Sequence, residues 1–126
     1  MRYSVVLTAG FPAIATSLLA PHFDVIAHPA EHERTEEEVS LLLNEADAAI
    51  VLATDPVTRA VLESNPNLRM VATFAPDPGN IDVAAARELG VTIAVTPDAD
   101  PEAMARIAAT NVLLFLRGRE PLHRIV

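Results

Sequence analysis

The stretch that decides the fold is Leu68 to Val95, LRMVATFAPDPGNIDVAAARELGVTIAV. An apolar run, 69–74, leads into a short polar turn, and a helix-like run from Ile81 to Leu89 follows it. Gly90 is typical of a helix end, and a second apolar run, 91–95, comes directly after it. A strand, a helix and a second strand in this order predict two parallel strands joined by a right-handed crossover.

The same alternation extends over the whole chain. Short buried strands that alternate with helices indicate a parallel sheet covered on both faces. Five strands in about 120 residues fit an α/β fold with the flavodoxin-like strand order 2-1-3-4-5. We expect residues 1–100 to form this unit, 101–118 a long apolar helix, and 119–126 a tail. The strands are expected at 3–8, 23–27, 48–53, 69–74 and 91–95, and the helices at 12–20, 35–46, 55–64, 81–90 and 101–118.

Helix starts are indicated by side chains that can accept hydrogen bonds from free backbone N–H groups. A capping box is expected where Thr35 is followed three residues later by Glu38. The other expected N-caps are Asp55 before Pro56, Asn80, and Asp100 before Pro101, and Gly90 and Gly118 are the expected helix ends.

Composition excludes several classes of function. The 126-residue chain has 17 acidic and 9 basic residues, a net charge of −8, and its bases are scattered apart from Arg117, Arg119 and Arg124. A nucleic-acid partner is therefore not expected, because such proteins present a basic patch. The chain has no cysteine, which excludes disulfides, thiolate metal sites and cysteine nucleophiles and is consistent with a cytoplasmic protein.

A membrane partner is not expected either. The N-terminal apolar run is interrupted by Gly10-Phe11-Pro12, which favours a buried strand followed by a turn over a secretion signal. The apolar run 107–116 includes Thr110 and Asn111 and is shorter than the roughly 20 residues that span a bilayer.

Ligands of open parallel sheets bind at the carboxyl ends of the strands. Three loops reach that edge: 9–12, 54–56 and 75–80. We therefore expect a small-molecule site there, built from Thr54, Asp55, Ala75, Pro76, Asp77, Gly79 and Asn80.

Asp77 is the candidate catalytic residue. It lies between Pro76 and Pro78 at the expected ligand edge, where a carboxylate can act as a general base or bind a cation. Threonines at the strand ends can donate hydrogen bonds to a bound anion or, more commonly, to nearby backbone; these are Thr8, Thr54 and Thr73.

Two other polar patterns are weaker signals. HPAEHE (28–33) matches the H-x-x-E-H metalloprotease pattern, but Pro29 and its loop context argue against the helix that this chemistry needs, so no metal site is expected. Asp98, Asp100 and Glu102 are interpreted as helix N-terminal residues rather than paired catalytic carboxylates. The chain has four glycines and no G-x-G-x-x-G, so no cofactor is expected to bind.

The last helix is apolar around most of its circumference toward its end. A helix that covers one face of a sheet needs only an apolar stripe. We therefore expect a homodimer formed through the 101–117 helix; the alternative is a helix packed deeply within one domain.

From Ala46 to Arg117 the chain resembles the D-isomer-specific 2-hydroxyacid dehydrogenases. The clearest segments are LESNPNLRMVAT (62–73), NIDVAAARELGVTIAVTPD (80–98) and LLFLR (113–117), and the first 45 residues fit the family's opening βαβα. The resemblance implies a flavodoxin-like substrate domain. In the family, a Rossmann domain that binds NAD and carries the catalytic Arg, Glu and His comes next, and we expect this chain to lack it. No histidine here matches the catalytic one: neither His22, His28, His32 nor His123.

The expected substrate loop departs from the family pattern. Family members usually have a glycine-rich turn before NID, and its backbone amides hold the substrate carboxylate. Here Pro76 and Pro78 remove two N–H donors and Asp77 adds a negative charge. Arg106 follows Ala105 where the family's helix usually has an acidic residue.

Three functions are therefore considered. The first is a stand-alone, truncated relative of the substrate domain that binds a small molecule or performs altered chemistry, and is not a competent dehydrogenase alone. The second is one subunit of a split dehydrogenase whose NAD-binding domain is a separate chain. The third is a structural or regulatory module that dimerises.

Overall fold

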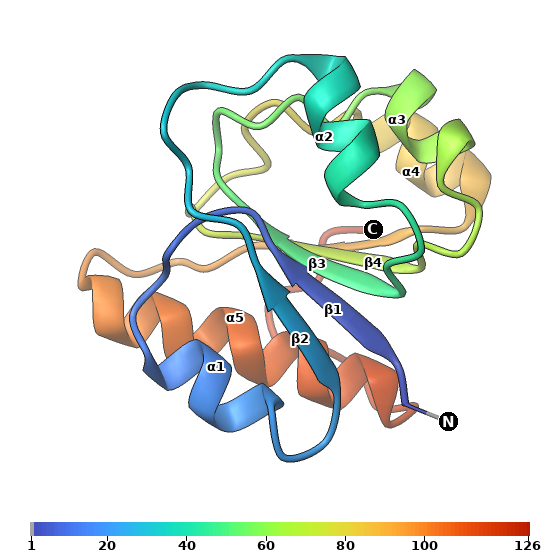
Figure 1. Cartoon of the computed structure of the whole chain (residues 1–126). Helices are drawn as coiled ribbons and strands as arrows, with labels where there is room; N and C mark the ends of the chain where they lie inside the picture. Colours follow the sequence, from blue (N-terminus) through green and yellow to red (C-terminus); the bar gives the residue numbers. More distant parts are fainter. Residues whose placement is uncertain (1) are drawn as a thin grey trace.

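A computed structural model describes residues 2–126 and contains the ten expected elements in the expected order. Figure 1 shows their arrangement. The strands are β1 (Ser4–Leu7), β2 (Asp24–Ala27), β3 (Ala48–Val51), β4 (Met70–Thr73) and β5 (Thr92–Ala94). The helices are α1 (Ile14–Leu19), α2 (Glu36–Leu42), α3 (Arg59–Ser64), α4 (Val83–Leu89) and α5 (Pro101–Leu116).

The strands form one parallel sheet in the order β2-β1-β3-β4-β5, which confirms the predicted α/β fold and strand order. The strands are aligned with little stagger. One row of paired residues crosses the whole sheet from β2 to β5: Val25, Val5, Ala48, Met70 and Thr92. All strands therefore end near one another, and the loops that follow them share one edge.

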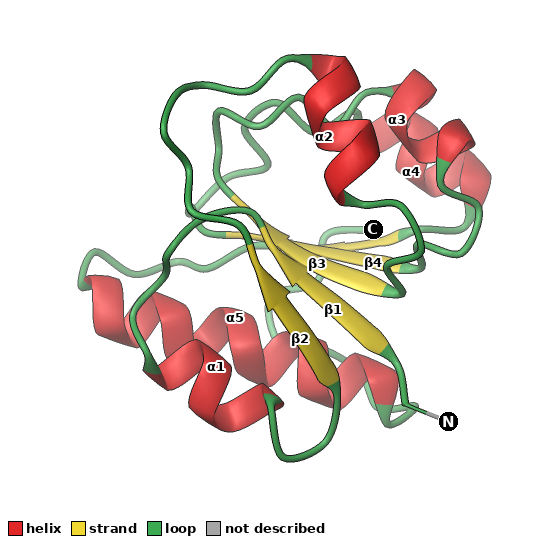
Figure 2. Cartoon of the chain, in the orientation of Figure 1, coloured by secondary structure: helices red, strands yellow, loops and turns green. Residues whose placement is uncertain are grey.

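Helices cover both faces of the sheet, as Figure 2 shows: α1 and α5 lie on one face, and α2, α3 and α4 on the other. Side chains alternate between the two layers along each strand. In β3, Ala48 and Ile50 belong to the core beneath α1 and α5, whereas Ala49 and Val51 belong to the core beneath α2 to α4.

Three predicted helix boundaries are confirmed. The capping box of α2 is complete, because Glu38 N donates to Thr35 Oγ1 (3.2 Å) and Thr35 N donates to Glu38 Oε1 (2.9 Å). Asp100 caps α5 by accepting from Ala103 N at 2.9 Å. Gly90 ends α4 in the left-handed conformation, with φ of 76°.

Two predicted helix starts are wrong. Helix α3 begins after Thr58 rather than Asp55, and α4 begins after Asp82 rather than Asn80. Both starts are delayed by a tertiary contact, since Val57 pairs with Ile81 in an isolated parallel bridge. This pairing keeps both segments extended for a few residues beyond the expected caps.

The segment 119–126 returns to the sheet. Arg124 forms an antiparallel bridge with Ala94, Ile125 N donates to Ile93 O (2.8 Å), and Val95 N donates to His123 O (3.1 Å). The β5 edge is thereby covered. Among the helices of residues 2–126, none is both long and apolar enough to cross a membrane.

Candidate ligand site at the carboxyl edge of the sheet

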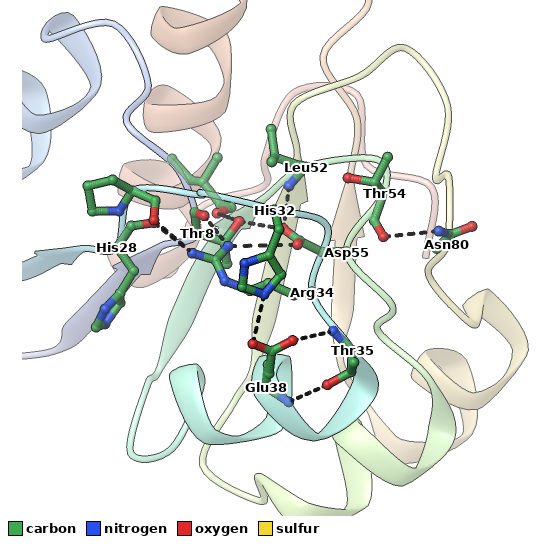
Figure 3. Close-up of polar contacts among 12 residues, drawn as sticks. Thr8, His28, His32, Arg34, Thr35, Glu38, Leu52, Thr54, Asp55 and Asn80 are labelled. Atoms are coloured by element: carbon green, nitrogen blue, oxygen red, sulfur yellow. Dashed lines mark hydrogen bonds and ion pairs between the residues drawn. The ribbon is translucent and has the colours of Figure 1, made fainter.

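Two of the predicted loops are joined directly at the carboxyl edge. Asn80 Nδ2 donates to Thr54 O and Asn80 N donates to Ala53 O, both at 3.1 Å. Figure 3 shows the Asn80 side chain pointing at Thr54. Thr54 and Asn80 are both exposed, so the structure brings these two predicted residues together on an accessible surface.

Gly79 allows the two loops to approach each other. Its φ is +57°, and a Cβ at this position would lie 2.6 Å from Ala53 O. Any larger residue would push the loops apart. Gly79, which was predicted to bind a ligand, is thus required for the close packing of the two loops.

The third predicted loop, 9–12, meets the site through an aromatic contact. The rings of Phe11 and Phe74 are 4.8 Å apart in a T-shaped arrangement. Both rings are partly buried, and they form an apolar border beside the polar turn that begins at Ala75.

The Asp77 carboxylate is turned onto its own loop. Asp77 is exposed, and its Oδ1 accepts a hydrogen bond from Gly79 N at 2.9 Å. Pro76 and Pro78 have no N–H to offer. Among the described residues, none accepts from the N–H of Ala75 or Asp77.

The start of the same loop is anchored to the end of β5. Ala75 is buried, and its carbonyl accepts from Thr96 N (2.8 Å) and Thr96 Oγ1 (3.2 Å). Thr96 Oγ1 also lies 2.9 Å from Thr73 O. Ala75 therefore holds the loop in place, while Pro76 and Asp77 project beyond it into solvent.

Asp55 is buried, unlike the other polar residues predicted for this site. Its Oδ2 accepts from Thr8 Oγ1 (2.5 Å) and Leu52 N (2.9 Å), and only 2% of the residue is exposed. These bonds account for its failure to cap α3, since the carboxylate is turned back toward the strands. They also leave it unavailable to a ligand from solution in this conformation.

Arg34 is a residue that the sequence analysis missed. Its Nη1 lies 3.9 Å from Asp55 Oδ1, and its side chain is only 9% exposed. The guanidinium also donates to Thr8 O and to His28 O (2.9 Å), as Figure 3 shows. No local signal could reveal this cluster, because Thr8 and Asp55 lie 26 and 21 residues from Arg34 in the chain.

The segment that matches H-x-x-E-H is a loop, so the helical geometry is absent, as expected. His32 Nε2 lies 3.0 Å from Glu38 Oε2. The backbone N–H of Thr35 lowers the pKa of Glu38, and the contact with His32 lowers that pKa further. Within residues 2–126, no group of three or more histidines and carboxylates is placed to hold a metal ion.

The acidic residues before α5 also have local partners. Asp98 Oδ1 accepts from Asp100 N (2.9 Å) and Ala99 N (2.7 Å), and these hydrogen bonds lower the pKa of Asp98. With Asp100 capping the helix, the interpretation as helix N-terminal chemistry is confirmed.

A family comparison gives this edge its context. Residues 5–126 match the family model of the D-isomer specific 2-hydroxyacid dehydrogenases, catalytic domain. The chain belongs to this family. The glyoxylate reductases of Thermococcus kodakarensis and Pyrococcus horikoshii are 32% and 29% identical to it over 117 residues, or 93% of the chain.

Solved 2-hydroxyacid dehydrogenase structures share the fold. A crystal structure from Polaromonas sp. JS6 66, assigned to the NAD-binding members of the family, superposes with a TM-score of 0.72 at 27% identity over 93% of the chain. The chain spans about a third of the length of these relatives, 35% of the two glyoxylate reductases and 36% of the Polaromonas protein. It is thus the counterpart of one part of a 2-hydroxyacid dehydrogenase.

Proposed function

We propose that the chain is the substrate-binding part of a 2-hydroxyacid dehydrogenase-like protein, and that a small molecule binds at the carboxyl edge. The observation that carries this proposal is the direct joining of the loops 52–56 and 74–80 through Asn80. Family membership supports it, because the match includes both loops. Open parallel sheets bind ligands at this edge, which supports it further.

The ligand class follows from the groups in the turn. The N–H groups of Ala75 and Asp77 can hold one anionic or carbonyl oxygen. The Asp77 carboxylate repels an anion from the same turn, so we expect a small 2-oxo acid to bind weakly. Asp77 Oδ2 has no partner among the described residues and can accept the hydroxyl proton of a 2-hydroxy acid, the reduced form of such a ligand, which is its proposed catalytic role.

The residues of this chain do not fit a dinucleotide. The turn after β1 has one glycine, Gly10, and Phe11 after it is occupied by its contact with Phe74. Family dinucleotide sites use several glycines so that backbone can approach the pyrophosphate. We therefore propose that hydride transfer, where it occurs, depends on a cofactor domain other than residues 2–126.

A second candidate is a subunit of a two-chain dehydrogenase. It is favoured by the poor fit of the turn after β1 to a dinucleotide, which leaves cofactor binding to another domain. Both candidates use the same edge for the substrate and differ in whether a separate NAD-binding chain completes the site.

The test is to titrate the 126-residue chain with glyoxylate and, separately, with NADH. Binding is monitored by the NMR chemical shifts of the backbone amides. The proposal expects glyoxylate to shift the amides of Ala75 and Asp77 and NADH to shift neither. Shifts confined to other faces of the sheet would overturn the site. Specific NADH binding would overturn the inference about the cofactor.

Asp77→Asn sharpens this test. Asparagine can still accept from Gly79 N, so the turn is kept while the charge is lost. Two charges about 4 Å apart in water interact by about 1 kcal/mol, so glyoxylate should bind about fivefold more tightly to the variant. Unchanged affinity would show that the ligand does not approach Asp77.

A further inference from the structure

The turn after β3 is closed by Asp55 through two hydrogen bonds. Asp55 N donates to Leu52 O (3.0 Å), and Leu52 N donates to Asp55 Oδ2 (2.9 Å). The two residues between them, Ala53 and Thr54, supply the carbonyls that accept from Asn80. The conformation of this turn therefore decides where the acceptors of Asn80 lie.

The contacts continue from Asn80 into the turn where the ligand is proposed to bind. Val57 N donates to Asn80 O (3.1 Å), so Asn80 is bonded to the loop after β3 through its side chain, its N–H and its carbonyl. The preceding residue, Gly79, donates through its N–H to Asp77 Oδ1 at 2.9 Å. The position of the turn 75–80 therefore depends on the shape of the turn after β3.

Asp55 closes its turn only while its carboxylate stays buried. Only 2% of that side chain is exposed, and Arg34 Nη1 lies 3.9 Å from its Oδ1. A buried carboxylate that has lost its cation is costly, and rotation toward water relieves the cost. Such a rotation would remove the acceptor of Leu52 N and open the turn. Arg34 is itself held by carbonyls, since it donates to Thr8 O and to His28 O (2.9 Å).

We propose that Arg34 is a positioning residue for the turn 75–80, and that it acts through Asp55 without touching the ligand. In Figure 3 the guanidinium of Arg34 points to Asp55, and the Asn80 side chain points to Thr54. The inference rests on the proposed function, which places the ligand at this turn. It goes further, because it makes the ligand affinity depend on a residue of the loop before α2.

The first experiment is an NMR titration of Arg34→Met with glyoxylate. Binding should be about tenfold weaker than in the wild type, as expected for a turn that is correctly placed about a tenth of the time. Arg34→Lys should lose less affinity, because lysine keeps the charge but lacks the planar fork that reaches several acceptors. Equal affinities of Arg34→Met and the wild type would overturn the proposal.

The matched control is Arg2→Met. Arg2 also donates to two backbone carbonyls, those of Ala20 and Phe23, and pairs with a carboxylate, that of Asp24. It precedes β1 and so lies at the opposite edge of the sheet. Glyoxylate affinity should therefore be unchanged in this variant, and a loss equal to that of Arg34→Met would count against a specific role of Arg34.

A double variant distinguishes positioning through Asp55 from general support of the fold. Asparagine at position 55 can still accept from Thr8 and Leu52, and it carries no charge that needs a cation. Asp55→Asn combined with Arg34→Met should therefore regain most of the lost affinity. A role of Arg34 confined to the loop before α2 would not be rescued in this way, and an unrescued double variant would overturn the proposal.

The amide chemical shifts of Val57 and Asn80 test the same coupling without a ligand. Their N–H groups donate between the two loops, to Asn80 O and Ala53 O. Both shifts should move in Arg34→Met, return in the double variant and stay unchanged in Arg2→Met. Arg34→Lys gives the same readout if Arg34→Met does not fold.

Unmoved shifts in the Arg34 variants would overturn the positioning role. Failure of the wild type to bind glyoxylate would count against the proposed function alone, because the shifts decide the coupling by themselves.

Discussion

Arg34 and Asp55 are paired across the carboxyl edge of the sheet, with Nη1 and Oδ1 3.9 Å apart and with 9% and 2% of their side chains exposed. The pair links the loop before α2 to the loop after β3. Thr8 joins both partners, because its hydroxyl donates to Asp55 and its carbonyl accepts from Arg34. One buried cluster thus fixes three loops at the edge where the ligand is proposed to bind.

Arg34→Met should destabilise the protein by about 3 kcal/mol, because it leaves the Asp55 carboxylate buried without its cation. Thr8 and Leu52 still donate to that carboxylate, which places the expected cost at the low end of the usual range. Urea unfolding would measure the loss. Arg59→Met is the matched control, because Arg59 pairs with Glu88 and Glu63 on the exposed surface and should matter little. Similar losses in the two variants would contradict the prediction.

Gly79→Ala should be more costly than Gly90→Ala. Both glycines have positive φ, +57° and +76°, and a left-handed residue other than glycine costs about 1–2 kcal/mol. Only at Gly79 would the new Cβ also collide with Ala53 O, whereas the space around Gly90 is open. Thermal unfolding measures this difference: both variants carry the strain of a positive φ, so the additional loss of melting temperature in Gly79→Ala reports the collision with Ala53 O. Equal melting temperatures would show that the loops can move apart freely.

Short-range signals in the sequence predicted much of the fold. Thr35 and Glu38, or Asp100 and Ala103, are three residues apart, so their hydrogen bonds depend only on the local helix geometry. Alternating strands and helices then allowed few arrangements, and the strand order followed from the parallel fold. The edge that carries the candidate loops could be located for the same reason.

Long-range side-chain partners could not be predicted. Asp55 looked like an N-cap because Pro56 follows it, yet its carboxylate bonds to Thr8, 47 residues away in the chain. Asn80 likewise looked like a cap and instead holds Thr54. Both misassignments fall at the carboxyl edge, where residues from separate loops compete for the same polar side chains.

Glu38→Gln should make the stability of α2 less dependent on pH. Hydrogen bonding to Thr35 N, and then to His32, holds the folded-state pKa of Glu38 below its ordinary value of 4.5. This carboxylate therefore stabilises the fold above pH 4.5, and the contribution is lost as the pH falls through the lowered pKa. Unfolding free energies measured between pH 3 and pH 7 should show the wild type's advantage shrinking in acid. A constant difference across this range would rule out a contribution from the charge.

Thr73→Val and Thr96→Val should change stability in opposite directions, although both replace a buried hydroxyl by a methyl group of similar size. Thr73 Oγ1 has no hydrogen-bond partner within the described residues, whereas Thr96 Oγ1 contacts the carbonyls of Thr73 and Ala75. Removing an unpaired buried hydroxyl should stabilise the protein by about 1 kcal/mol, and removing the paired one should cost at least about as much. For a domain of this size, calorimetry should show melting temperatures about 4 °C above and below that of the wild type. A lower melting temperature for Thr73→Val would mean that its hydroxyl does have a partner at the end of β4, such as a bound water or ligand.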